Sequence, residues 1–345
     1  MKKTIVISLF VAFVLVACGD KKGGVQGSGW IFAPPEGVAL DTVSIDTMDV
    51  RNPFIRYEYR ENLYYMVADG GCMWVSSDLR EWVGPYKVLC QDPTSWIGIS
   101  PVVTSPEIHK INGRYYYMAT FESPGVEALD ADGKPFARRS CVALVADSVC
   151  GPYMTIDNRS DLLVTTEMAA HPTHGLDHLG VSYMIYTHQG EQNGNGTVQI
   201  VRFSKDFGKR VGEAYIMFSA SENGWSGTEN GVGRAFSPIM DAPFLFMTDG
   251  GEMGILFTTY VGDEKAIGVA YTATGIYGYN GPWTIEPQPL LEGVGNAMLF
   301  DDYDGTKVMV VNKDTVVNGE ARSVARFYKL DMQFEKIKIE GHYKF

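Results

Sequence analysis

Positive charge is scarce in this sequence. Twenty-nine Lys and Arg face 41 Asp and Glu among 345 residues, which gives a formal net charge of -12 at pH 7, and no run of basic residues offsets it. Such a chain repels a phosphate backbone, so nucleic acid is excluded as a partner. The hydrophobic fraction of 45% and the charged fraction of 20% are ordinary for a folded globular protein, which excludes a disordered chain.

Sustained helical periodicity is also lacking. No stretch repeats apolar residues every 3.6 positions, which argues against a helical or α/β fold. The sequence is rich instead in glycine (38), tyrosine (19) and phenylalanine (17). Aromatic residues favour pleated surfaces and glycine favours tight turns, so we expect an all-β protein of many short strands.

Long apolar runs are absent after the N-terminus. Residues 1–17 have the features of a secretion signal, with Lys2 and Lys3 before a short apolar stretch. The stretch ends in Leu-Val-Ala before Cys18 and resembles the lipobox of bacterial lipoproteins; a plain secretory signal with a chance cysteine is the alternative. We expect lipidation at Cys18, a flexible tether over 18–29, and one domain over 30–345. The expected location is the bacterial cell envelope, with the bilayer contacted only through the anchor.

Cysteine pairs at metal-binding spacing are missing, since no Cys-x-x-Cys and no Cys/His cluster occurs. Four cysteines remain after Cys18, an even set in an exported chain. The pairings closest along the chain are Cys72 with Cys90 and Cys141 with Cys150. Free buried thiols are an equally good interpretation.

A unit of about 55 to 70 residues recurs five times. Each unit has a loop with a polar residue, an apolar strand, a turn and an aromatic strand, and a Gly-Pro type turn leads to an outer strand. The polar anchors are Asn52, Glu107, His171, Asp241 and Asn296. This spacing predicts a five-bladed β-propeller of four-stranded antiparallel blades, with a two-sheet sandwich as the alternative. The first residues of innermost strands converge on a propeller axis, so we expect the anchors to line one pocket.

Five phrases in order carry a family resemblance from about residue 49 to 330. They are Arg-x-Pro-Phe-Ile from Arg51, Ser-Asp-Leu from Ser77 with Trp82, Pro-Glu-Ile-His from Pro106, Ala-Ser with Trp225, and Gly-Val-Ala from Gly268. The chain resembles the five-bladed propellers of glycoside hydrolase family 43, which act on arabinose- and xylose-containing polysaccharides. The resemblance implies an inverting glycosidase with an oligo- or polysaccharide partner.

The resemblance also assigns roles to individual residues. The family's base is the aspartate of an Arg-Asp-Pro phrase, and here Asn52 stands in its place. Its third carboxylate aligns with His171 or a neighbour, with Glu167 and Asp177 as alternatives. Its acid aligns with Asp241 before Ala-Pro. An amide cannot deprotonate water, so the catalytic set is degenerate and Asn52→Asp is expected to raise activity.

The other candidate site residues surround this set. Glu107 aligns with a carboxylate on the family's pocket floor, and Asn296 replaces a histidine near a central ion or water, so a calcium ion there is the one cofactor considered. Arg51, His109, Trp96 and Trp225 are candidate sugar contacts. The structural alternatives are a turn role for Asn52 and Asp241, an ion pair between Glu107 and Arg51, His109 or Arg234, and tryptophans that fill gaps between blades. Metal binding by histidines 109, 171, 174 and 178 is disfavoured.

Three function classes follow from these residues. The first is a hydrolase whose base is another carboxylate, such as Asp49, Asp69 or Glu107. The second is a glycan-binding lipoprotein that has lost turnover. The third is a phosphorylase-like enzyme, which would need a cationic cluster from Arg51, His109, His171 and Arg234.

Overall fold

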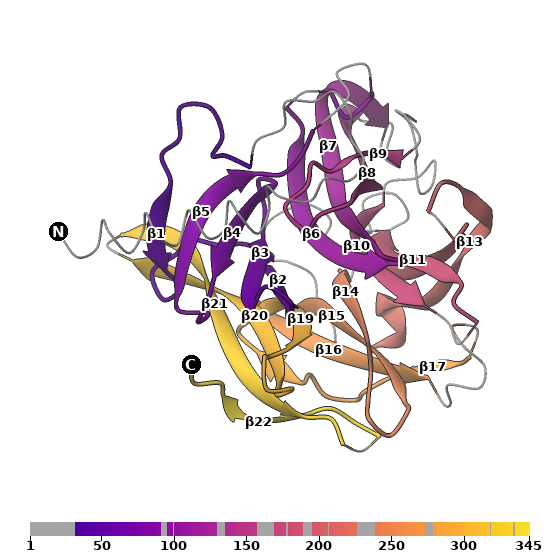
Figure 1. Ribbon diagram of the computed structural model, residues 1–345. Coiled ribbons are helices and arrows are strands. Elements are labelled where there is room, and N and C mark those ends of the chain that lie inside the picture. The colour runs from indigo at the N-terminus through magenta and orange to yellow at the C-terminus, as the bar shows by residue number, and fades with distance from the viewer. Residues whose placement is uncertain are drawn as a thin grey trace.

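The computed structural model describes residues 32–90, 95–98, 100–129, 135–156, 169–176, 179–188, 195–205, 207–225, 239–272, 279, 281–317, 319–333 and 335–345. Five antiparallel sheets follow one another along the chain and surround a common axis (Figure 1). The all-β, five-bladed propeller is confirmed. Sequence features within residues 1–31, including Cys18 and the tether, lie outside the described residues.

Each blade runs outward from the axis in the order of the sequence. The strands, blade by blade, are β2 (Phe54–Glu58), β3 (Leu63–Val67), β4 (Cys72–Ser76) and β5 (Glu81–Lys87); β6 (Val102–Ile111), β7 (Arg114–Leu129), β8 (Pro135–Ala146) and β9 (Met154–Thr155); β10 (Ala170–Leu176), β11 (Ser182–His188), β12 (Thr197–Phe203) and β13 (Arg210–Ser219), followed by the 3-10 turn η2 (Ala220–Glu222); β14 (Asp241–Met247), β15 (Met253–Val261), β16 (Glu264–Thr272) and β17 (Trp283–Ile285), with β18 (Leu291–Glu292) also on β16; and β19 (Gly295–Asp301), β20 (Lys307–Val317), β21 (Glu320–Asp331) and β22 (Lys338–His342).

The ring closes between the first and last blades. The innermost strands contact one another in the circular order β2, β6, β10, β14, β19 and back to β2. Backbone bonds join the two ends of the ring, since the Val50 amide donates to the Ser323 carbonyl at 2.8 Å. β1 (Asp41–Ser44) adds a fifth strand to blade 1 by pairing with β5. Each innermost strand pairs with one strand of its own blade, so its other edge faces the axis, where the neighbouring blades shield it.

The second strand of each blade supplies much of the core. All five residues of β3 are buried, and so are all of β15 except its last residue. Close approach requires glycine at one point of this core. A Cβ on Gly268 would lie 2.3 Å from the Phe257 ring, so only glycine lets the ring lie flat on β16. The aromatic strands seen in the sequence therefore pack between blades.

One backbone feature repeats in all five blades. Near the start of each innermost strand a non-glycine residue has φ between 45° and 53°, in the left-handed region. These residues are Asn52, Ser105, His171, Ala242 and Asn296. A proline follows in the first four blades, and in blades 2 to 5 the pairing register shifts at this point. Proline has no amide hydrogen to donate to the hydrogen bonds between strands, and a β-bulge changes the direction of the local side chains. The left-handed residue, with its proline or bulge, therefore directs the start of each innermost strand toward the axis.

This register corrects two of the five predicted anchors. The residue equivalent to Asn52 in blade 2 is Ser105, two positions before Glu107, and in blade 4 it is Ala242, one after Asp241. The sequence interpretation followed the acidic side chains, whereas the backbone conformation sets the repeat. Asn52, His171 and Asn296 are equivalent to one another, as expected.

The local disulfide pairings are wrong. Cys72, Cys90 and Cys141 are free thiols, so neither Cys72–Cys90 nor Cys141–Cys150 forms. Cys150 is disulfide-bonded. Cys72 and Cys141 lie in β4 and β8, where their positions follow from strand packing rather than from closeness along the chain.

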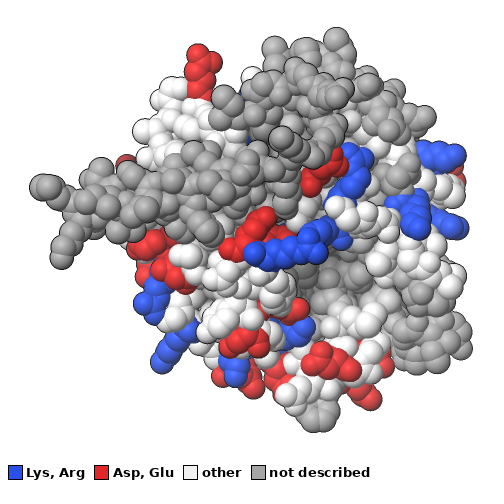
Figure 2. All heavy atoms as spheres, viewed as in Figure 1, with Lys and Arg blue, Asp and Glu red and all other residues white. Residues whose placement is uncertain are grey.

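No helix in the described residues is long and apolar enough to cross a bilayer. On the described part of the face in Figure 2, basic and acidic side chains are interspersed, and neither sign dominates the surface there.

Candidate functional site

The left-handed residues line a small pocket on the propeller axis. Its walls are the first residues of the five innermost strands: Asn52, Pro53, Phe54, Ser105, Pro106, Glu107, His171, Pro172, Ala242, Pro243, Asn296, Ala297 and Met298. The cavity volume is about 30 Å³, enough to hold water. Segments 52–54 and 296–298 are separated by most of the chain, so the pocket exists only in the closed ring.

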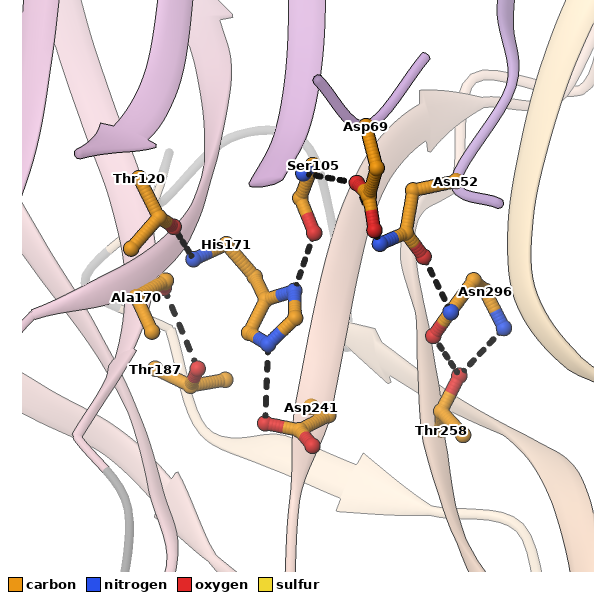
Figure 3. A network of polar contacts seen from close by, with 10 residues as sticks. All are labelled: Asn52, Asp69, Ser105, Thr120, Ala170, His171, Thr187, Asp241, Thr258 and Asn296. Carbon is orange, nitrogen blue, oxygen red and sulfur yellow. Dashed lines mark hydrogen bonds and ion pairs between the residues drawn. The ribbon is translucent and has the colours of Figure 1, made fainter. Parts of the chain in front are cut away.

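Asn52 lies at the centre of a chain of amide hydrogen bonds (Figure 3). Its Nδ2 donates to Asp69 Oδ1 at 2.8 Å, and its Oδ1 accepts from Asn296 Nδ2. Its backbone amide donates to Asn312 Oδ1 at 2.8 Å. Both ends of the side-chain amide are therefore used. A carboxylate at position 52 could keep the bond from Asn296 but not the bond to Asp69.

Asp69 holds two blades together behind the pocket. The same Oδ1 that accepts from Asn52 also accepts from the Ser105 backbone amide at 2.8 Å. Burial raises the pKa of Asp69, while the hydrogen bonds from Asn52 and Ser105 act in the opposite direction. An ionised acceptor suits this place, because both of its partners are donors.

Ser105, His171 and Asp241 form a second chain of contacts across the pocket (Figure 3). Ser105 Oγ lies 2.5 Å from His171 Nδ1, and His171 Nε2 lies 3.4 Å from Asp241 Oδ1. The His171 backbone is fixed by a 2.7 Å bond from its amide to Thr120 Oγ1. The imidazole thus has one neighbour at each ring nitrogen, contributed by two different blades.

Glu107 and His109 make a buried pair on the floor of the pocket. Glu107 Oε2 and His109 Nε2 are 2.6 Å apart. Burial raises the pKa of Glu107 well above its ordinary value, opposed by a hydrogen bond to Thr173. Burial, with the charge of Arg56 adding to it, lowers the pKa of His109 to about 3. Burial therefore disfavours the charged form of both members of this pair.

The two candidate tryptophans do not line the pocket. Trp225 Nε1 donates to the Glu286 carbonyl at 3.0 Å, and its ring stacks on Phe257. The Trp96 ring packs on the core and lies 5.2 Å from the Arg138 guanidinium. Both tryptophans therefore fill gaps in the packing, which was the structural alternative.

The remaining candidates are scattered. Arg51 is exposed, and its charge lowers the pKa of Asp69 only as a minor influence. Asp49 is exposed, and its Oδ1 accepts from the Ser323 amide at the seam between blades 1 and 5. Glu167, Asp177, His178 and Arg234 lie outside the described residues.

The axis does not fit a calcium ion. Calcium takes about six to eight oxygen ligands, usually including carboxylates. The described residues contain no group of three or more His, Cys, Asp or Glu that could hold a metal ion. The amide oxygens of Asn52 and Asn296 accept hydrogen bonds from Asn296 and Thr258. Both amide oxygens are therefore engaged as acceptors, and no step of the chemistry is assigned to a metal.

Comparisons with known proteins identify the fold family. The profile described as "Glycosyl hydrolases family 43" matches residues 45–315. The chain belongs to this family. Membership confirms the resemblance found in the sequence.

Several solved structures share the fold. An endo-arabinase from Bacteroides thetaiotaomicron VPI-5482 is 22% identical, with a TM-score of 0.71 over 90% of this chain and 99% of that one. An endo-1,4-beta-xylanase from the same bacterium is 14% identical, with a TM-score of 0.63 over 88% and 97%. An exo-1,5-alpha-L-arabinanase from a bovine ruminal metagenomic library is 17% identical, with a TM-score of 0.60 over 86% and 98%. No curated protein sequence matches the chain.

Sequence reasoning missed Ser105 and the bridging role of Asp69. A signal for Ser105 was present, because a polar or small residue before proline recurs in four blades, at Asn52, Ser105, His171 and Ala242. Aligning the blades on this residue–proline dipeptide gives the same register of the innermost strands as the structure. Nothing local marks Asp69, which follows β3 and reaches the axis only through the packing of blades 1 and 2.

Proposed function

We propose that this family 43 protein binds arabinose- or xylose-containing glycans in its axial pocket and hydrolyses them slowly. The observation that carries the proposal is Asn52, an amide at the family's base position, held between Asp69 and Asn296. The pocket and the fold support a carbohydrate ligand, and the similar proteins named above are an arabinase, an arabinanase and a xylanase.

Asp241 is the proposed general acid. Its Oδ1 lies 3.4 Å from Nε2 of His171, the residue that the family resemblance aligns with the third carboxylate. The acid would protonate the leaving oxygen of the glycosidic bond. An inverting enzyme also needs a base about 6.5–9.5 Å away to activate water.

The described carboxylates offer no good replacement for that base. Glu107 is buried and its Oε2 lies 2.6 Å from His109 Nε2, so this carboxyl group is engaged inside the wall of the pocket rather than directed at a water. Asp69 accepts from Asn52 and Ser105 behind the pocket wall, and Asp49 lies at the seam between blades. Losing a general base lowers the rate about 10²–10⁴-fold, so slow turnover is the expected consequence.

A glycan-binding protein without turnover is the second candidate, favoured by the same amide. The phosphorylase-like alternative gains no support from two of its four cationic candidates, since Arg51 does not line the pocket and burial disfavours the charged form of His109.

The test combines binding with kinetics on the purified protein. Calorimetry with arabinan and xylan oligosaccharides should detect binding that Asn52→Ala weakens. Lys329→Gln, which removes only an exposed ion pair with Glu340, should leave binding unchanged. Hydrolysis of aryl arabinofuranosides and xylosides should be at least about a hundredfold slower than by a relative with a carboxylate base. Asp241→Asn should abolish any activity that is present. Absence of binding to every arabinose- or xylose-containing glycan would refute the proposal.

The proposed location is the bacterial cell envelope, with a lipid on Cys18 after removal of residues 1–17. The support is the Leu-Val-Ala-Cys sequence after a short apolar stretch. Cys18→Ser should release the protein from membranes of the native host and abolish metabolic labelling with a lipid precursor. Continued membrane association of this variant would contradict the anchor.

A further inference from the structure

The contacts at the axis suit a reaction other than glycoside hydrolysis. Ser105, His171 and Asp241 are arranged as hydroxyl, imidazole and carboxylate, with separations of 2.5 Å and 3.4 Å. A nucleophile within hydrogen-bond reach of a base, which is oriented by a third group, is the general signature of covalent catalysis. We propose that Ser105 is a nucleophile that cleaves small acyl esters, such as an acetyl group on a sugar hydroxyl.

Asp241 sets the tautomer that this reaction needs. A carboxylate beside Nε2 favours the hydrogen on that nitrogen, which leaves the Nδ1 lone pair directed at the Ser105 hydroxyl. Ser105 can then donate its proton to Nδ1. The 3.4 Å separation is longer than an ideal hydrogen bond, and catalytic contacts of this kind commonly shorten when substrate binds.

Ser105 is open to the pocket and held in an unusual conformation. It lines the axial cavity together with His171, and its φ is 49°. The same left-handed conformation occurs at the equivalent position of every blade, so the propeller architecture imposes it. At Ser105 it places a hydroxyl beside a base, whereas the equivalent Ala242 has no reactive group.

Two amides can stabilise the negative charge that forms on the ester oxygen. Asn52 and Asn296 line the same pocket as Ser105. Each side-chain nitrogen carries two hydrogens, of which one goes to Asp69 and one to Asn52, respectively. The second hydrogen of each has no acceptor among the described residues. Fixed donors of this kind stabilise a tetrahedral oxyanion.

The reaction balances with one water and no other reactant. Ser105 Oγ bonds to the carbonyl carbon while its proton moves to His171 Nδ1. The bond from that carbon to the alcohol oxygen then breaks, and the alcohol leaves with the proton from Nδ1. Water attacks the acyl-serine and gives a proton to Nδ1, and Oγ takes this proton back as the carboxylic acid leaves. The cavity volume of about 30 Å³ favours a small acyl group.

A fluorophosphonate probe tests the nucleophile directly. Serine oxygen displaces fluoride from the probe and forms a stable bond to phosphorus, which mass spectrometry can assign to a residue. We expect the adduct on Ser105, together with hydrolysis of p-nitrophenyl acetate. His171→Asn should slow both reactions at least about a hundredfold, since it removes the base. Asparagine already occupies the equivalent left-handed position in blades 1 and 5.

The controls separate loss of the nucleophile from loss of the fold. Ser105→Ala should abolish labelling and remain folded, because Ala242 adopts the same conformation in blade 4. Ser105→Gly, which has no strain at positive φ, checks the same point. Ser221→Ala should have no effect, since Ser221 is exposed and bonds to Asn195 rather than to a histidine.

An adduct on another serine, or ester hydrolysis unchanged in Ser105→Ala, would overturn the proposal. This activity depends on Ser105 as the nucleophile, which glycoside hydrolysis does not use, although Asp241 serves both reactions, as a carboxylate here and as a protonated acid in hydrolysis. Calorimetry with glycans can therefore fail while labelling succeeds, and the reverse outcome is equally distinguishable.

Discussion

Replacing Asn52 alone should not restore a glycosidase, contrary to what the sequence suggests. The Asn52 amide nitrogen lies 2.8 Å from Asp69 Oδ1. In Asn52→Asp a carboxylate oxygen takes that place and faces Asp69. Two unit charges at this separation repel by about 6 kcal/mol at an effective dielectric constant of about 20. Keeping one aspartic acid protonated at pH 7 costs about 4 kcal/mol, given an ordinary pKa near 3.9. The pair should therefore share one proton, and a protonated carboxyl is no base.

A double variant avoids this conflict. In Asn52→Asp with Asp69→Asn the carboxylate and the amide exchange places. With its nitrogen in the place of Asp69 Oδ1, the new Asn side chain can donate to the carboxylate at position 52, while the bond that Oδ1 accepts from the Ser105 amide is lost. The base then stands at the family's position with a donor beside it. We expect kcat/KM for an aryl arabinofuranoside or xyloside to rise at least about a hundredfold over the natural protein.

The natural protein and the two single variants, Asn52→Asp and Asp69→Asn, are the controls for the double variant. Asn52→Asp should gain less than about tenfold, because its carboxyl stays protonated. Asp69→Asn should gain nothing, because it adds no base. All variants are compared by circular dichroism and by pH profiles of kcat/KM. If Asn52→Asp alone matches the double variant at pH 7, the repulsion argument is wrong. If the double variant gains nothing while still binding glycan, the missing base is not what limits turnover.

Two further predictions concern stability. Gly268→Ala should destabilise the protein by about 1–3 kcal/mol in denaturant unfolding, because its Cβ would meet the Phe257 ring at 2.3 Å; Gly224→Ala, with nothing within 4 Å, should be nearly neutral. Burial, with His109 nearby, lowers the pKa of His174 to about 3. The unfolded chain therefore binds an extra proton as pH falls from about 6.5 toward 3, and stability should fall over that window. The fall in melting temperature should be smaller in His174→Gln, and an equal fall in both proteins would contradict this assignment.

The fold was predictable because the repeat was visible in the sequence. A strand, a turn and an aromatic strand recur at blade spacing, and turn chemistry marks the boundaries. Four of the five predicted anchors, Asn52, Glu107, His171 and Asn296, line one pocket. The fifth, Asp241, is not among its lining residues and lies 3.4 Å from His171. The register of the acidic residues was not predictable from their charge, since the left-handed residue before proline sets it.

Packing contacts between blades could not be predicted from the sequence. Trp96 and Trp225 look alike as loop aromatics, and only the packing of neighbouring blades decides that they fill the interior. The cysteine pairing failed for the same reason. Closeness along the chain made Cys72–Cys90 attractive, whereas in the structure Cys72 lies in β4, Cys90 follows β5, and both are free thiols.

The axial network indicates that this site is built around an amide. Asn52 both donates to Asp69 and accepts from Asn296, and a carboxylate can make only the second of these bonds. Asparagine also tolerates the left-handed conformation that every blade requires at this position. The change from the family's aspartate therefore preserves the backbone while it reverses the hydrogen-bond polarity beside Asp69. A fold can hold its register in this way and still change its chemistry, so family membership does not by itself establish activity. The activity depends on which side of the pocket still has a proton acceptor, and in this structure that acceptor is His171 beside Ser105.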